Sequence, residues 1–200
     1  MKGVLQYARL SSTPQDRRAR IASDIANANR AWGTGFSPGV SCEINFVSGG
    51  TWNATGRTIN ASLLSASLNH ASIDNLIKEI RRNVGDLTAI YVLYLSGEAF
   101  SNGSTVGVGG TRQKFNNSNA LVGHIALTNR AGDTNSPYLF AHEAGHCLGL
   151  GHFRNSQNLM YGNGNRPVPR SNPFLTSGQC RLARQSKLIL QNATRNSRRS

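Results

Sequence analysis

Three histidines and one glutamate lie close together between residues 142 and 152, at a spacing that suits zinc chemistry. On a helix, His142 and His146 are one turn apart and point the same way, so both imidazoles could bind one ion. Glu143 lies beside them, where its carboxylate could handle a metal-bound water without being a ligand. Gly149 lets the chain leave the helix in a left-handed conformation and return His152 as a third ligand. Three protein nitrogens leave one position of the ion open, which is typical of a catalytic zinc.

The alternative is that these are ordinary helix residues that happen to be histidine. The short form of the pattern, two histidines one turn apart with the glutamate, is a weak signal. The extended form with Gly149 and His152 is expected in roughly one chain in ten thousand by random draw, so we favour the metal site. Further along, Met160 lies in the run Asn158-Leu159-Met160-Tyr161 and, taken alone, would be ordinary core filler.

These residues resemble the metzincin superfamily of zinc endopeptidases, through the long motif and a Met-turn at Met160. The resemblance implies zinc ligands at His142, His146 and His152. It also implies a general base at Glu143 and packing of Met160 beneath the metal.

Within the superfamily the match leans towards matrixin-like enzymes, because Tyr161 follows the methionine directly. We therefore expect Tyr161 to form a wall of the substrate pocket. Astacin- and serralysin-like members carry a zinc-binding tyrosine two residues past the methionine, where this chain has Gly162. Phe153 departs from the serine or threonine that usually follows the third histidine in matrixins.

The resemblance implies an α+β fold: a twisted mixed sheet with packed helices, an active-site helix, and a small helical C-terminal subdomain below a cleft. It implies hydrolysis of internal peptide bonds of protein substrates through a zinc-activated water, with one catalytic Zn²⁺. An edge strand above the zinc would pair with an extended substrate. Residues 105–110 and 120–128 are the candidates, and topology favours the first. A flexible hairpin is the other interpretation of its glycines.

The formal charge of +13 would draw anionic partners such as nucleic acid, acidic glycans or lipid headgroups. The arginines are scattered, and no zinc finger, recognition helix or aromatic stacking motif accompanies them. We therefore expect a solvated basic surface and no specific nucleic-acid recognition. Two rival functions are a basic zinc-containing binding module without hydrolytic activity and a hydrolase acting on a different amide.

The chain of 200 residues suits one catalytic domain over residues 1–192, followed by a basic, disordered tail over 193–200. The upper subdomain would cover about 1–151 and the lower about 152–192. No run of apolar residues is long enough to span a membrane. The start lacks the apolar stretch of a secretory signal, so either a signal was removed or export follows another route. We expect a secreted, monomeric protein.

Three cysteines make an odd number, and only five histidines are present. The metzincin resemblance places the last helix near the active-site helix, which would let Cys147 pair with Cys180. The alternative, three buried thiols including Cys42, stays equally open. His70 and His124 lie outside the motif and are too few for a second zinc, and no acidic loop suits calcium. We therefore expect a single metal ion.

Strands and helices must place these residues, and the hydrophobic pattern predicts them as follows. Strands are expected at 4–10, 42–47, 87–95, 105–110 and 120–128, with the third buried on both faces. A first helix begins at Pro14 and ends at Gly33, and a second runs from Ser72 to Gly85. The motif helix opens at Ser136 and Pro137. Thr176 and Gln179 predict a capping box for a last helix through about Asn192, while 49–69 is mostly loop.

Overall fold

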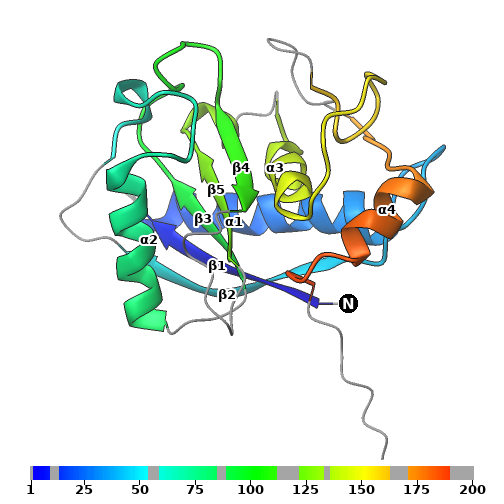
Figure 1. Cartoon of the computed structure of the whole chain (residues 1–200), viewed down its shortest axis with the longest axis horizontal. Helices are drawn as coiled ribbons and strands as arrows, with labels where there is room; N and C mark the ends of the chain where they lie inside the picture. Colours follow the sequence, from blue (N-terminus) through cyan, green and yellow to red (C-terminus); the bar gives the residue numbers. More distant parts are fainter. Residues whose placement is uncertain are drawn as a thin grey trace, which may run out of the picture.

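A five-stranded sheet forms the centre of the molecule (Figure 1). The computed structural model describes residues 2–9, 14–53, 59–84, 89–111, 122–132, 136–162 and 171–189. The strands are β1 (Lys2–Arg9), β2 (Asn45–Asn53), β3 (Ala89–Tyr94), β4 (Gly107–Thr111) and β5 (Val122–Leu127). Their order across the sheet is β2-β1-β3-β5-β4. All neighbours are parallel except β4, which is an edge strand and runs antiparallel to β5.

Helices cover both faces of this sheet. The four longer helices are α1 (Pro14–Asn29), α2 (Ala71–Val84), α3 (Leu139–Cys147) and α4 (Ser177–Arg184). Shorter helical turns lie at Arg30–Thr34, Ala61–Leu63 and Arg130–Gly132. The core beside α2 is separate from the core shared by α1, α3 and α4. The mixed α+β architecture predicted from the sequence is therefore confirmed.

Strand β3 is buried on both faces, as its nearly continuous apolar sequence predicts. Ile90, Val92 and Tyr94 belong to the core with α1 and α3. Ala89, Tyr91 and Leu93 alternate with them and pack with α2. Because successive side chains of a strand point to opposite faces, this alternation places the two helical layers on opposite sides of the sheet.

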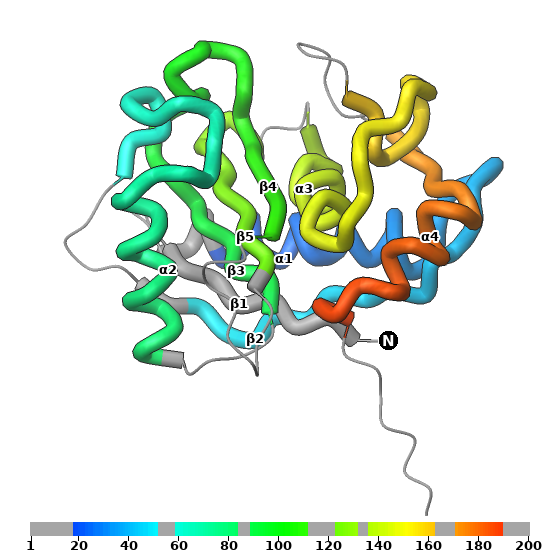
Figure 2. Tube along the Cα trace, in the orientation of Figure 1, coloured from blue at the N-terminus to red at the C-terminus, as the bar shows by residue number. Residues whose placement is uncertain are grey.

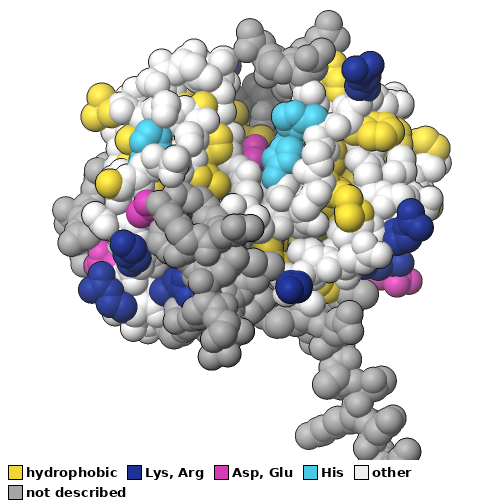
Figure 3. All heavy atoms as spheres, in the orientation of Figure 1, with side chains coloured by type: hydrophobic (Ala, Val, Ile, Leu, Met, Phe, Trp, Pro, Cys, Tyr) yellow, Lys and Arg dark blue, Asp and Glu magenta, His cyan; other side chains and the backbone are white. Residues whose placement is uncertain are grey.

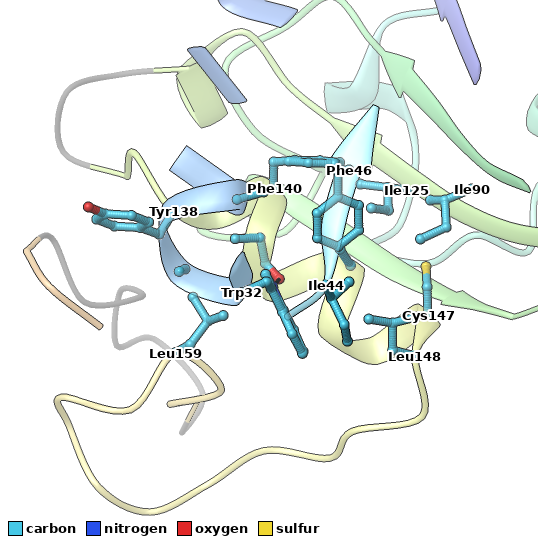
Figure 4. Close-up of a cluster of buried hydrophobic side chains, with 14 of the residues drawn as sticks. Trp32, Ile44, Phe46, Ile90, Ile125, Tyr138, Phe140, Cys147, Leu148 and Leu159 are labelled. Atoms are coloured by element: carbon cyan, nitrogen blue, oxygen red, sulfur yellow. Dashed lines mark hydrogen bonds between the residues drawn. The ribbon is translucent and has the colours of Figure 1, made fainter. Parts of the chain in front are cut away.

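Aromatic side chains fill the larger core, between α1, β2 and α3 (Figure 4). The rings of Phe46 and Phe140 meet edge to face, with 5.8 Å between their centroids. Trp32 is fully buried, and its indole N–H donates to the carbonyl of Ala141 at 3.1 Å. Packing and a hydrogen bond to its backbone therefore hold helix α3 in place independently of any ligand.

The second strand begins later than the sequence predicts. Cys42, Ile44 and Phe46 are buried in alternation, which is the pattern that indicated a strand at 42–47. However, the N–H groups of Cys42 and Ile44 donate to the carbonyl of Trp32 rather than to a strand. Glu43 has a φ of 54°, which interrupts an extended ladder. β2 therefore begins at Asn45 and continues to Asn53, into a region predicted to be loop.

The last helix is shorter than predicted. Its capping box is confirmed: the Thr176 side chain accepts from the Gln179 N–H, and the Gln179 side chain accepts from the Thr176 N–H. The helix ends at Arg184, and turns follow as far as Ile189. Leu188 and Ile189 are nonetheless buried. Their apolar side chains continue the spacing of the helix, which explains why the sequence predicts a longer one. The predicted end at Asn192 and the tail at 193–200 lie outside the described residues.

In the described part of the chain, no helix has the length and apolarity needed to cross a bilayer.

A buried polar cluster joins α1 to the end of β3. The Tyr94 hydroxyl donates to Oδ2 of Asp24 at 2.9 Å, and Nε of Arg20 lies 3.6 Å from the same oxygen. Burial raises the pKa of the Asp24 carboxyl to about 6, although Arg20 and the Tyr94 hydrogen bond both act to lower it. The cluster therefore titrates in a mildly acidic range.

We expect Asp24→Asn to remove a pH-dependent part of the stability. Because the folded pKa lies above the unfolded value of 3.8, this group's contribution is complete below about pH 4 and is lost as the pH rises through about 6. A shift of this size corresponds to at most about 3 kcal/mol. Asparagine still accepts from Tyr94 but does not titrate. The measurement is the free energy of unfolding in urea at pH 4 and at pH 7. Between these pH values wild type should lose about 2–3 kcal/mol that the variant does not lose. A difference independent of pH would contradict this.

Candidate metal centre

Helix α3 carries the first two histidines and the glutamate of the motif on its buried side. His142 and Glu143 are almost fully buried, with 4% and 5% of their surfaces exposed. His146 follows one turn later and is half-buried. The helix ends at Cys147, and Gly149 then takes a φ of 93°, which lets the chain turn sharply. His142 and His146 therefore lie one turn apart on one helix, with their ring nitrogens close together.

The turn after α3 returns His152 to the other two histidines. Figure 2 shows the chain (yellow) running beside α3 before it reaches α4 (orange). The N–H of Leu150 donates to Gly145, and the N–H of Phe153 donates to Met160, so both sides of His152 are fixed. One ligand atom from each of His142, His146 and His152 lies within 4.8 Å of the others. Histidine side chains reach the surface beside a hollow in this face (Figure 3).

Backbone carbonyls orient the two helical imidazoles. Nδ1 of His142 lies 2.7 Å from the carbonyl of Leu159, and Nδ1 of His146 lies 2.8 Å from that of Leu150. A carbonyl can only accept, so each Nδ1 carries the proton and each Nε2 keeps its lone pair. The two Nε2 atoms are 3.2 Å apart. Two nitrogens at about 2.0–2.1 Å from one tetrahedral zinc ion are separated by about 3.3 Å, so this donor set fits zinc.

Burial also keeps these histidines neutral. It lowers the pKa of His142 to about 4, assisted by the neighbouring His146 and His152 and opposed by the hydrogen bond to Leu159. Burial lowers the pKa of His146 as well, and His152 adds to the effect. Since only the neutral imidazole binds a metal, the pair is ready to act as ligands at neutral pH.

Glu143 lies in the opposite electrostatic situation. Burial raises the pKa of its carboxyl to about 8, and a hydrogen bond from the backbone N–H of Gly109 opposes this only in part. A divalent cation held by the three histidines would favour the ionised carboxylate. The side chain is thus placed to gain or lose a proton beside the candidate metal position.

Edge strand β4 lies directly against Glu143. Its register pairs Gly109 with Ile125 of β5, so its other edge is the outer edge of the five-stranded sheet. The sequence left two candidate edge segments, and the structure selects the one at Gly107–Thr111, because β5 lies inside the sheet. A Cβ on Gly109 would lie 2.8 Å from Cβ of Glu143 and 2.5 Å from its carbonyl oxygen. The close approach of strand and helix requires glycine here.

Gly109→Ala should therefore separate β4 from α3. We expect a loss of about 1–3 kcal/mol of unfolding free energy, typical of overpacking, together with a displaced Glu143. Gly110→Ala is the matched control, because the nearest atom to a Cβ at that position is Cδ1 of Leu68 at 4.0 Å. Thermal unfolding of the two variants should separate them by several degrees. Equal melting temperatures would contradict the close approach.

The segment after the third histidine returns beneath the site. Met160 is fully buried and its Sδ lies against Gly145 of α3. Tyr161 is 8% exposed, and its N–H donates to the carbonyl of Asn158 at 2.9 Å. Gly162, two residues past Met160, lies against the His152 ring and has no side chain that could act as a ligand. Residues 163–170, which follow this turn, lie outside the described residues.

The cysteine pairing differs from both alternatives drawn from the sequence. Cys42 forms a disulfide with Cys180, and Cys147 is a buried free thiol. The prediction of a Cys147–Cys180 bridge is therefore wrong. Sγ of Cys147 lies 3.4 Å from the carbonyl of His124 and 3.5 Å from that of Gly110, so it points at the sheet and away from α4. Burial raises the pKa of the Cys147 thiol to about 12, which makes it unreactive.

The two remaining histidines have structural positions. His124 is fully buried in β5 and stacks on Tyr91, with 6.1 Å between ring centroids. Nε2 of His70 lies 3.0 Å from the carbonyl of Ser65. Within the described ranges, His142, His146 and His152 form the only group of metal-binding side chains.

The sequence did not reveal every residue that shapes the site. The carbonyls of Leu159 and Leu150 carry no side-chain signal, and only the folded chain shows that they orient the histidines. Asn158 is also fully buried, and its Oδ1 accepts from the N–H of Met160 at 2.9 Å. Asparagine side chains often accept a hydrogen bond from the backbone N–H two residues further on. The position of Asn158 two residues before Met160 is the sequence signal that could have indicated this contact.

Comparison with known proteins gives a likeness of fold. No protein-family profile matches the sequence, and neither does any curated protein. Metalloproteinase-II from Bacteroides fragilis matches 95% of this chain with a TM-score of 0.59 and 18% sequence identity. That match covers 54% of the metalloproteinase, so this chain spans about half its length. A zinc-dependent peptidase from Methanocorpusculum labreanum has a TM-score of 0.45 at 15% identity, over 90% of this chain and 98% of that one. At such identities the first likeness shows the fold alone, and the second is too low to carry an argument.

Proposed function

We propose that this protein is a zinc-dependent endopeptidase of the metzincin type, which hydrolyses internal peptide bonds of protein substrates. The observation that carries the proposal is the convergence of three histidines beside one buried carboxylate, with Nε2 of His142 and His146 at 3.2 Å. A site that served only structure would have no use for Glu143 next to an open position. The similarity in fold to a metalloproteinase agrees with this function.

His142, His146 and His152 would hold one Zn²⁺. When bound, the ion would supply a Lewis acid and an activated water at neutral pH. The Glu143 carboxylate would take the proton of that water and pass it to the nitrogen of the leaving amine. Burial of Glu143 excludes bulk solvent from this proton, and the Gly109 N–H fixes the carboxylate position.

The edge of β4 is the proposed docking strand for the substrate. An extended peptide that adds to a sheet edge forms main-chain hydrogen bonds regardless of its side chains. β4 lies at the sheet edge and against Glu143 at once, so a peptide added there would pass the histidines. We propose Tyr161 as a wall of the adjoining pocket and Met160 as the apolar floor beneath the ligands.

The wider assignments are proposals of the same kind. We propose a matrixin-like arrangement with an upper part to about residue 151 and a lower part from 152 to 192, acting as a secreted monomer. The disulfide between Cys42 and Cys180 is compatible with an oxidising compartment.

Chelator-sensitive cleavage tests the function directly. We expect purified protein loaded with one equivalent of Zn²⁺ to cleave casein, to lose this activity with a chelator, and to regain it when zinc is restored. Mass-spectrometric profiling on a proteome-derived peptide library should show new termini at internal peptide bonds. Zinc-loaded protein that leaves all peptides intact, but binds heparin or DNA with a steep salt dependence, would favour a binding module instead.

A further inference from the structure

The turn that orients His142 is itself held by a pair of side-chain amides. Nδ2 of Asn158 donates to Oε1 of Gln179 at 2.9 Å, and Nε2 of Gln179 donates to Oδ1 of Asn158 at 3.0 Å. Asn158 precedes Leu159, whose carbonyl lies 2.7 Å from Nδ1 of His142. One hydrogen-bonded route therefore leads from α4 to the first histidine.

The hydrogen bonds of Asn158 fix its identity and its orientation. Its Oδ1 accepts from both Gln179 and the N–H of Met160, at 3.0 and 2.9 Å. The reversed amide would set a donor against the Met160 N–H. Aspartate could not donate to Gln179, and an apolar residue would leave the buried Met160 N–H without a partner. Since Asn158 is fully buried, water cannot replace these bonds.

The far end of the route is firmly anchored. Gln179 is also the acceptor of the α4 capping box, where its Oε1 accepts from the N–H of Thr176 at 2.9 Å. One residue later, Cys180 is joined to Cys42. Nε of Arg184 donates to the carbonyl of Cys42 at 2.7 Å. Gln179 thus projects from a helix that cannot easily shift, and it can impose a position on the turn at Asn158.

We propose that Asn158 and Gln179 are positioning residues for the metal site, acting through the Leu159 carbonyl to orient His142. This inference rests on the proposed zinc site. Hydrogen-bond partners of metal ligands typically change metal affinity 10–100-fold when they are lost. Because the amide pair acts one step further out, we expect the lower end of this range, about 10-fold.

Gln179→Glu and Thr176→Ala separate this role from a merely structural one. Glutamate keeps the capping-box acceptor and an acceptor for Asn158, but the ionised side chain cannot donate to Oδ1 of Asn158. Loss of this buried hydrogen bond should cost about 1 kcal/mol of stability, while zinc affinity falls about 10-fold. Its added negative charge alone would strengthen cation binding, which is the opposite sign. Thr176→Ala removes the cap and costs about 1 kcal/mol, but keeps the amide pair and should bind zinc as wild type does.

The measurements are zinc affinity by competition with a chromophoric chelator at pH 7 and urea unfolding of the metal-free protein, both on the full chain. The absorption spectrum of the Co²⁺-loaded protein should change in Gln179→Glu but not in Thr176→Ala, because it reports the ligand arrangement. Asn158→Asp removes the other hydrogen bond of the pair, the one that Asn158 donates to Gln179. This variant should also bind zinc about 10-fold more weakly.

The outcomes distinguish this inference from the function beneath it. Equal zinc affinity and an unchanged Co²⁺ spectrum in wild type, Gln179→Glu and Asn158→Asp would overturn the positioning role and leave the peptidase proposal standing. Affinity that follows stability across all three variants would also overturn it. A wild-type chain that binds no zinc would overturn the proposed function and this inference together.

Discussion

Glu143→Ala is expected to abolish peptide hydrolysis while leaving zinc bound. The carboxylate is not one of the three converging ligands, so its removal leaves the histidine site intact. General acid–base catalysis typically contributes about 10²–10⁴-fold, and a loss of this order in kcat/KM is expected. Casein cleavage in samples matched for zinc content is the measurement. Wild-type cleavage by a metal-loaded Glu143 variant would refute the assigned role.

Two further variants complete this experiment. His146→Ala should lose both zinc and activity, because it removes a ligand rather than the proton acceptor. Glu98→Ala is a matched control, since Glu98 is an exposed carboxylate in the loop after β3. It should keep both properties. This pattern would separate metal binding from proton transfer.

Loss of the Cys42–Cys180 disulfide should cause the largest fall in stability. The two cysteines are 138 residues apart, and in the chain-entropy model a loop of this length corresponds to about 5 kcal/mol. Measured losses for native disulfides are usually about 2–5 kcal/mol. We expect the double variant Cys42→Ser, Cys180→Ser to unfold at clearly lower urea concentration than wild type. Adding a reductant should not lower the stability of this variant any further.

Cys147→Ala provides the control for this prediction. It removes the free buried thiol but keeps the disulfide, so it should lose stability on reduction as wild type does. A thiol count on denatured, unreduced wild type should give one free group. Three free groups would contradict the pairing.

The parts of the site that could be predicted are those fixed by local geometry. The spacing of His142 and His146 on one helix specifies their shared direction whatever surrounds the helix. The capping box of α4 is equally local, because Thr176 and Gln179 satisfy each other. The central strand was predictable because only a strand covered on both faces carries so continuous an apolar run.

The parts that could not be predicted depend on tertiary contacts. Cys147 faces the sheet rather than α4, a direction set by how α3 packs on β4 and β5. The late start of β2 follows from hydrogen bonds of Cys42 and Ile44 to the Trp32 carbonyl. Trp32 belongs to the preceding helical turn, so a local sequence pattern does not indicate this pairing. The amides of Asn158 and Gln179 meet only once the chain has folded back, so neither position indicated the other.

The first strand, β1, lies inside the sheet, between β2 and β3. Its register with β3 pairs Leu5 with Ile90, and β3 in turn pairs with β5. Such pairings give a high contact order, so during synthesis the sheet cannot be completed until residues near 127 have been made. Proteolytic removal of residues 2–9 would therefore take out an interior strand and is expected to unfold the sheet.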